Sequence, residues 1–188
     1  MAVRRALFQD GRATKRSRTS INRTVSRAID SRQETKVTRT SSQFLNGPLT
    51  GLNIELNALS NGAMEGQRVG NRVRNVRLTA QLVAKQTGAI RIVLYCPKNP
   101  SASIPTTTRF SSIDPADFWI LHDKLYVNGP NGSYCINLNK RLNFHTHWGN
   151  TSSNGFQRNP IKCFMTTDDQ GGVNGTVEGH FNVYYKDS

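Results

Sequence analysis

The fold is decided first by the stretch Val73-Arg74-Asn75-Val76-Arg77-Leu78-Thr79-Ala80-Gln81-Leu82-Val83-Ala84-Lys85. Its central residues alternate in character, with Val76, Leu78, Ala80 and Leu82 interleaved with Arg77, Thr79 and Gln81. A period of two places the apolar side chains on one face of a strand and the polar side chains on the other. The stretch therefore predicts a half-buried β-strand.

Six further runs rich in β-branched and aromatic residues accompany this strand, at 52–59, 89–96, 118–127, 134–144, 160–167 and 176–185. Asn-Gly pairs, a strong turn signal, fall at 46–47, 61–62, 128–129, 131–132, 154–155 and 174–175. One short helix is predicted at Asp114-Pro115, an N-cap residue followed by proline. Many strands with almost no helix predict an all-β fold, an eight-stranded antiparallel jelly roll.

Positive charge is concentrated at the N-terminal end. Residues 1–40 contain eleven of the 25 Lys and Arg residues but three of the 12 Asp and Glu residues, which leaves +8 of the total net charge of +13. Such a segment repels itself, and Arg binds phosphate through two parallel hydrogen bonds. We therefore expect a largely disordered nucleic-acid-binding arm over residues 1–45 and one folded domain over 46–188. The expected binding residues are Arg4, Arg5, Arg12, Lys15, Arg16, Arg18, Arg23, Arg27, Arg32, Lys36 and Arg39.

Two features subdivide the arm. Apolar residues at 21, 25, 28 and 29 follow helical spacing, which predicts a short helix over 20–30 that forms on binding. Lys15-Arg16-Ser17-Arg18 is a compact basic cluster of the kind that a nuclear import receptor reads, although phosphate binding explains it equally well. A solvated terminus and a targeting peptide are the alternatives for the whole segment. No apolar run approaches the roughly 20 residues of a membrane span, so we expect no membrane partner.

A second basic cluster consists of Arg68, Arg72, Arg74 and Arg77. Arg72 and Arg74 share one face at strand spacing. The cluster faces either nucleic acid or a neighbouring subunit. Asp123-Lys124 interrupts an otherwise apolar strand, which is typical of an edge strand or of one whose charges meet another subunit.

The best candidate for catalysis is His145-Thr146-His147, because residues two apart on a strand point the same way and two imidazoles can ligate one metal. A jelly-roll metalloenzyme of the cupin type also needs a nearby carboxylate. Residues 148–153 contain none, and Glu178 and His180 are distant. Nucleophile-elbow and phosphate-loop motifs are absent as well. We therefore expect no catalytic residues, no catalytic metal and no enzyme activity.

Adjacent carboxylates at Asp168 and Asp169 offer hard oxygen ligands in a predicted turn. Together with Asp187 they could hold a structural Ca²⁺ between subunits. No other cofactor is expected.

Three segments resemble small single-jelly-roll viral capsid proteins, including those of satellite tobacco necrosis virus and of circular, Rep-encoding single-stranded DNA viruses. They are 57–73 (NALSNG…GQRVGNRV), 118–128 (FWILHDKLYVN) and 175–187 (GTVEGHFNVYYKD), in the family's order and spacing. With the basic arm, the resemblance spans most of the chain. It implies an eight-stranded jelly roll, a closed icosahedral T=1-like shell of sixty identical subunits, and packaging of a single-stranded DNA or RNA genome in a virion assembled in the host cell.

Three hypotheses remain at the level of sequence. The first is a self-assembling container for nucleic acid. The second is a monomeric nucleic-acid-binding module with a basic tail, which predicts basic and aromatic residues across the folded body. The third is the metalloenzyme, which lacks its carboxylate.

Overall fold

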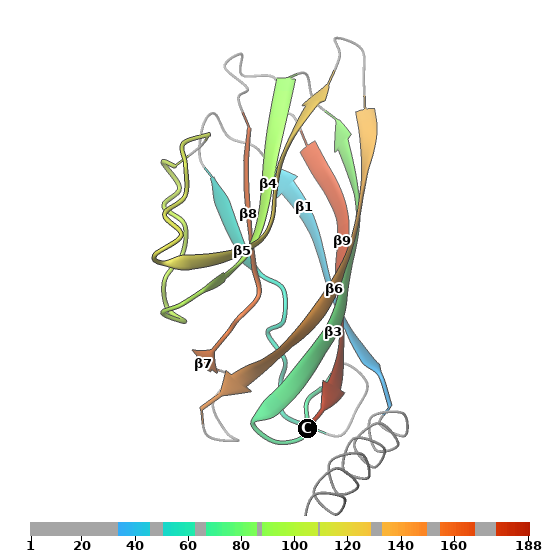
Figure 1. The fold of residues 1–188 in the computed structure, drawn as a ribbon. Helices are drawn as coiled ribbons and strands as arrows, with labels where there is room; N and C mark the ends of the chain where they lie inside the picture. The colour runs from blue at the N-terminus through green and yellow to red at the C-terminus, as the bar shows by residue number, and fades with distance from the viewer. Residues whose placement is uncertain are drawn as a thin grey trace, which may run out of the picture. The chain divides into compact units, whose positions relative to one another are not determined.

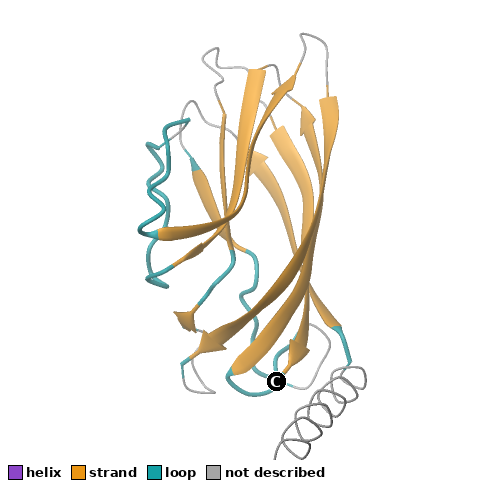
Figure 2. Cartoon of the chain, viewed as in Figure 1, coloured by secondary structure: helices purple, strands orange, loops and turns teal. Residues whose placement is uncertain are grey.

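The computed structural model describes residues 34–45, 51–62, 67–85, 88–108, 110–128, 133–149, 155–167 and 176–188. The folded body spans residues 35–188. Within the described residues it consists of nine strands and their connections, without a helix (Figure 2). This part of the chain accordingly has no helix suited to crossing a membrane. The predicted helix over 20–30 and the basic residues up to Arg32 lie outside the described residues.

Two antiparallel sheets face each other (Figure 1). The first has the order β1-β9-β3-β6-β7 and the second the order β2-β8-β4-β5. The strands are β1 (Lys36–Leu45), β2 (Leu52–Glu55), β3 (Arg72–Lys85), β4 (Gly88–Pro97), β5 (Phe118–Asn128), β6 (Ser133–Trp148), β7 (Phe156–Arg158), β8 (Lys162–Thr167) and β9 (Thr176–Asp187).

The strand pairing is nested. β4 pairs with β5, β3 with β6, β2 with β8 and β1 with β9, so the chain is one long double strand rolled into two sheets. The three-residue β7 is an addition at the edge of the first sheet. The other eight strands have the topology of a jelly roll, which confirms the predicted fold class.

The N-terminal boundary of the body differs from the predicted one. Lys36–Leu45 is a ten-residue strand paired along its whole length with β9, so residues 36–45 belong to the sheet and not to a free arm. Sequence patterning misses this strand because it is mostly polar, KVTRTSSQFL. Backbone hydrogen bonds to β9 hold it at the edge of the sheet.

Strand β3 contains an irregularity that changes which side chains face the core. Asn75 pairs with Tyr185 and Arg77 with Tyr184, so Val76 is an extra residue relative to β9. Such a bulge interrupts the period of two. The buried positions therefore run 73 and 75, then 78, 80, 82 and 84. The predicted inward position of Val76 is wrong for this reason, since it is only half-buried.

The main core lies between the sheets and contains Leu78, Leu82, Ile92, Cys163 and Phe181. A second cluster around Val93 and Tyr95 lies on the other face of β4, under the segment 98–117. Both faces of β4 are covered, which explains why its sequence is apolar without alternation.

Two local features complete the fold. Asp114 starts a turn and not the predicted helix. Its side chain accepts a hydrogen bond from the Ala116 amide at 2.7 Å, as an N-cap does, but residues 115–117 form only a turn before β5 begins at Phe118. Gly179 in β9 has φ +148°, and a Cβ there would overlap the Gln81 carbonyl oxygen of β3. Only glycine fits this position without displacing the neighbouring strand.

Candidate nucleic-acid interface

The outward face of the first sheet is basic. Across β1, β9, β3, β6 and β7, register places four neighbouring rows of side chains on it: Arg39–Asn182–Thr79–Asn139, Val37–Tyr184–Arg77–Arg141, Lys186–Arg74–His145, and Arg72–His147–Arg158. We call these four rows the basic sheet face. It carries six arginines and one lysine, and none of its residues is acidic. Glu178 lies on the same side of β9, beyond the rows, and forms an ion pair with Lys85 at 3.3 Å.

Cations lie directly opposite one another on this face. Arg77 is the cross-strand partner of Arg141, and Arg74 is the partner of Lys186. Like charges in directly opposite positions destabilise a sheet. The arrangement therefore costs free energy in the isolated protein, and an anion laid across the rows removes that cost.

Asparagine side chains hold three of the arginines. The guanidinium of Arg39 donates to Asn182 Oδ1 at 3.1 Å, that of Arg74 to Asn143 Oδ1 at 3.1 Å, and that of Arg77 to Asn139 Oδ1 at 2.9 Å. An amide oxygen orients a guanidinium without cancelling its charge. The guanidinium of Arg77 also lies 5.9 Å from the ring centroid of Tyr184. The face thus presents oriented donors that suit phosphate oxygens.

Two histidines lie within the same rows. His145 and His147 point to one side of β6, as their spacing predicts, with ring centroids 6.5 Å apart. Partial burial, and then the positive charge of Arg72, lower the pKa of both imidazoles. Arg74 contributes further at His145 and Arg158 at His147. A neighbourhood of cations favours an anionic ligand over a metal ion. Among the described residues no group of three His, Cys, Asp or Glu side chains comes together.

The structure separates the four arginines of the second predicted cluster. Arg72, Arg74 and Arg77 lie on the basic sheet face. Arg68 does not, because its side chain is buried beneath the sheet's end, 4.8 Å from the ring centroid of Trp148. Its Nε donates to the Leu59 carbonyl at 3.3 Å, and Nη1 donates to the carbonyl of Gly70. Arg68 is therefore a core residue, and its prediction as an interface residue is wrong.

Two predicted arm residues also fall within the body. Arg39 lies exposed on the basic sheet face. Lys36 makes contacts within the body, because its ammonium lies 2.8 Å from the Asp187 carboxylate and donates to the Gln67 carbonyl. The Asp187 carboxylate forms this ion pair and also accepts a hydrogen bond from the Val69 amide. Asp168 and Asp169, which were predicted to hold calcium together with Asp187, lie outside the described residues.

Sequence reasoning missed three members of the face, Arg141, Arg158 and Lys186. The signal for Arg141 was present in β6, where positions 137, 139, 141, 143, 145 and 147 are all polar, although Lys140 and Thr146 interrupt the apolar set between them. Arg158 and Lys186 carry no local signal, because they reach the face only through pairing with His147 and Arg74.

No family model matches the sequence, and no curated protein matches it. The chain is similar to a mutant VP2 protein of infectious bursal disease virus in derived T=1 particles, with 12% identity, a TM-score of 0.33 and coverage of 80% of this chain. It spans about a third, 32%, of that protein's length. It is also similar to the 60-mer BFDV capsid protein, with 12% identity, a TM-score of 0.34 and coverage of 81% of this chain and 92% of the other. The jelly roll of this chain is established by its own strand order.

Proposed function

We propose that this chain is the coat protein of a small virus, which assembles with identical copies into a closed, T=1-like icosahedral shell of sixty subunits and packages a single-stranded genome. Its place is then the virion, assembled in the host cell, with import into the nucleus if the cluster at residues 15–18 is read as an import signal. The basic arm and the basic sheet face together bind the nucleic acid.

The observation that carries this proposal is the row structure of the basic sheet face. Seven cations in the four rows of the basic sheet face, two pairs of them directly opposite each other, are a poor arrangement for an isolated protein and a good one for a polyanion. Contacts to phosphates give affinity without requiring a particular base sequence. That is the kind of binding that packaging a whole genome requires.

The arm contributes a second set of charges. Nine Lys and Arg residues precede the folded body, which begins at residue 35. A container needs more positive charge than one sheet face provides, because every packaged nucleotide brings one phosphate.

A monomeric nucleic-acid-binding module is the second candidate. The basic sheet face favours it to some degree, because that hypothesis predicts basic and aromatic side chains such as Tyr184 on the folded body. The two candidates differ in assembly, since only a coat protein forms uniform closed particles.

The test is electron microscopy of the full-length recombinant chain, mixed with single-stranded DNA or RNA and then treated with nuclease. Uniform closed particles that protect nucleic acid are expected. Monomers at every concentration, with nucleic acid bound but digestible, would establish the second candidate instead.

A full-length variant with the nine arm cations replaced by Gln isolates the role of the arm. It is expected to protect much less nucleic acid per particle than the unaltered chain. Equal protection would show that the arm does not package. Digesting the protected material with DNase or RNase identifies the cargo.

A further inference from the structure

Strands β5 and β6 belong to different sheets and face each other along one side of the sandwich. β5 is the last strand of its sheet, and only the short β7 lies beyond β6. Trp119, His122 and Lys124 of β5 are partners of core residues of β4, so they share the inner face of that sheet. Lys140 and Phe144 of β6 are partners of buried residues of β3 and also point inward. Basic side chains on inner faces are uncommon, because burying an unpaired charge is costly.

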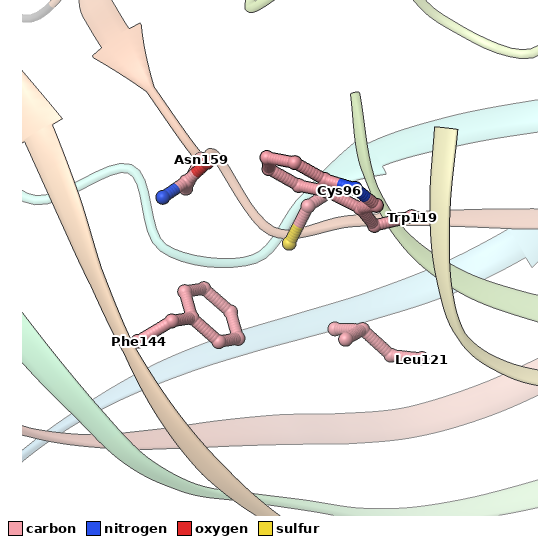
Figure 3. A pocket seen from close by; sticks show the side chains of 5 residues that line it. All are labelled: Cys96, Trp119, Leu121, Phe144 and Asn159. Atoms are coloured by element: carbon pink, nitrogen blue, oxygen red, sulfur yellow. The ribbon is translucent and has the colours of Figure 1, made fainter. Parts of the chain in front are cut away.

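One part of this side is hollow (Figure 3). The pocket has a volume of about 320 Å³ and is lined by Cys96, Trp119, Leu121, Phe144 and Asn159. Two irregularities shape its wall, since Leu121 is an extra residue of β5 relative to β4 and Asn159 has φ 54°. Bulges and positive φ values redirect side chains. Trp119 is one of the exposed hydrophobic residues, so a ligand from solution can reach its ring.

The walls suit a flat aromatic group. Trp119 and Phe144 border the hollow from the two facing strands (Figure 3), and every nucleobase has a π-face that can stack on such a ring. Asn159 Nδ2 donates to the His145 carbonyl at 2.8 Å, which fixes the carboxamide. Its Oδ1 accepts no hydrogen bond from the described residues and can accept one from a base. Burial raises the pKa of the Cys96 thiol to about 12, so this wall carries no charge.

Cations lie beside the hollow on the same inner faces. Lys140 is four residues from Phe144, about 13 Å along β6. Burial, and then the positive charges of Lys140 and Lys124, lower the pKa of His122, so both ammonium groups lie near its ring. Asp123, the acidic residue of β5, is ion-paired on the opposite face of the sheet. Neither lysine forms an ion pair with a described carboxylate. The ligand that fits is therefore an aromatic group that carries negative charge.

The pocket and the basic sheet face lie on the two sides of β6. Consecutive residues of a strand point to opposite faces, so Arg141 and His145 lie in the rows of the basic sheet face, whereas Lys140 and Phe144 point inward. From residue 133 to 146, no described strand pairs with the other edge of β6. A single strand of nucleic acid that contacts the rows can therefore pass around this edge and turn a base into the hollow.

A fatty acid is the competing ligand, because it also joins an apolar part to a negative charge. It needs neither a ring to stack on nor a fixed carboxamide, and it has no reason to lie beside the basic sheet face. Trp119, Asn159 and the position of β6 thus favour the nucleotide.

We propose that this pocket binds one base of the single-stranded nucleic acid, stacked on Trp119, while Lys124 and Lys140 contact the flanking phosphates. This inference deepens the proposed function and rests on it for the identity of the ligand. Stacking accepts every base, so the pocket is compatible with packaging a whole genome.

An abasic strand separates the base from the phosphates, because it keeps every phosphate and lacks the bases. Fluorescence anisotropy of the full-length chain measures Kd for a labelled oligothymidylate and for an abasic strand of the same length. The pocket variant is Trp119→Leu. The matched control is Phe110→Leu, which removes an exposed aromatic ring outside the pocket.

The unaltered chain and Phe110→Leu are expected to bind the oligothymidylate at least about fivefold more tightly than the abasic strand. Trp119→Leu is expected to lose this preference while its affinity for the abasic strand stays unchanged, which shows that the variant is folded. Lys140→Gln should weaken the binding of both strands by the same factor, since it removes a phosphate contact. A preference undiminished in Trp119→Leu, or reduced equally in Phe110→Leu, would overturn the proposal.

Fluorescence of the unaltered chain gives a test that needs no variant. The chain has two tryptophans, Trp119 at 47% exposure and Trp148 at 1%, so quenching by a ligand reports Trp119. The oligothymidylate is expected to quench part of the emission, and the abasic strand is not. Quenching by laurate in the absence of any quenching by the oligothymidylate would assign the pocket to a fatty acid and refute the base site.

These measurements do not require particles, so the two proposals can fail separately. A chain that shows the base preference but never assembles loses the coat function and keeps the pocket. Closed particles from a chain without the base preference would refute the pocket alone.

Discussion

Replacing Arg141 by Gln separates stability from binding. Arg141 lies exposed on β6, directly opposite Arg77 on β3. Removing one of two opposed like charges is expected to raise the free energy of unfolding by about 0.2–1 kcal/mol. For a chain of this length, that raises Tm by up to about 4 °C. The variant should thus be at least as stable as the unaltered chain.

The same variant should bind nucleic acid more weakly. Each phosphate contact contributes about 0.7 to the slope of log K against log salt for a single strand. Losing one contact therefore lowers the slope by about 0.7, which corresponds to about fivefold weaker binding at 0.1 M salt and about twofold at 0.3 M, relative to a 1 M reference. A more stable protein that binds less tightly is the signature of charges placed for a ligand.

The assay is fluorescence anisotropy of a labelled single-stranded oligonucleotide over a series of salt concentrations, together with thermal unfolding of the free protein. Lys98→Gln is the matched control. It makes the same change in net charge at an exposed residue that follows β4, where the ammonium donates to the Pro115 carbonyl at 2.8 Å. If Arg141→Gln leaves the salt slope unchanged, or if Lys98→Gln changes it equally, the basic sheet face is not the binding surface.

Three further predictions concern the body itself. Gly179→Ala should cost about 1–3 kcal/mol from the backbone conformation alone, with a further loss from overlap with β3, and thermal unfolding should show a lower Tm in the variant. Arg68→Ala should lower the free energy of unfolding by about 2–4 kcal/mol, since it removes the contact with the Trp148 ring and leaves the buried Leu59 carbonyl without its donor. Urea unfolding measures this loss, and an unchanged midpoint would contradict a core role. Burial and neighbouring arginines lower the pKa of His145 and His147 in the folded chain. The unfolded chain therefore takes up protons at these histidines at a higher pH than the folded chain does. As a result, the free energy of unfolding falls as the pH drops through about 6.5. The double variant His145→Asn/His147→Asn should therefore lose less Tm than the unaltered chain between about pH 7.5 and about pH 5, and parallel losses would refute this origin.

Much of the architecture could be predicted from local patterns. Alternation, β-branched runs and Asn-Gly turns predicted seven of the nine strands and the all-β class, because these signals arise from neighbouring residues alone. The edge position of the strand with Asp123 and Lys124 is one of the two outcomes that charge in an apolar strand predicted, the other being contact with another subunit. β1 was not predictable in this way. Its polar sequence forms a strand only because β9 offers unpaired backbone groups beside it.

The arginines show most clearly which features follow from local sequence and which depend on the folded chain. The clustering of basic residues at 68–77 can be seen in the sequence alone. In a strand with unbroken alternation from the buried Leu78, however, Arg72 and Arg74 would point toward the core and only Arg77 would point outward. The extra residue at Val76 reverses that alternation, so all three lie on one outward face. Arg68, from the same cluster, is buried against Trp148. A bulge is specified by pairing with β9 and β6, and burial by contacts from distant strands, so neither is contained in the local order of residues.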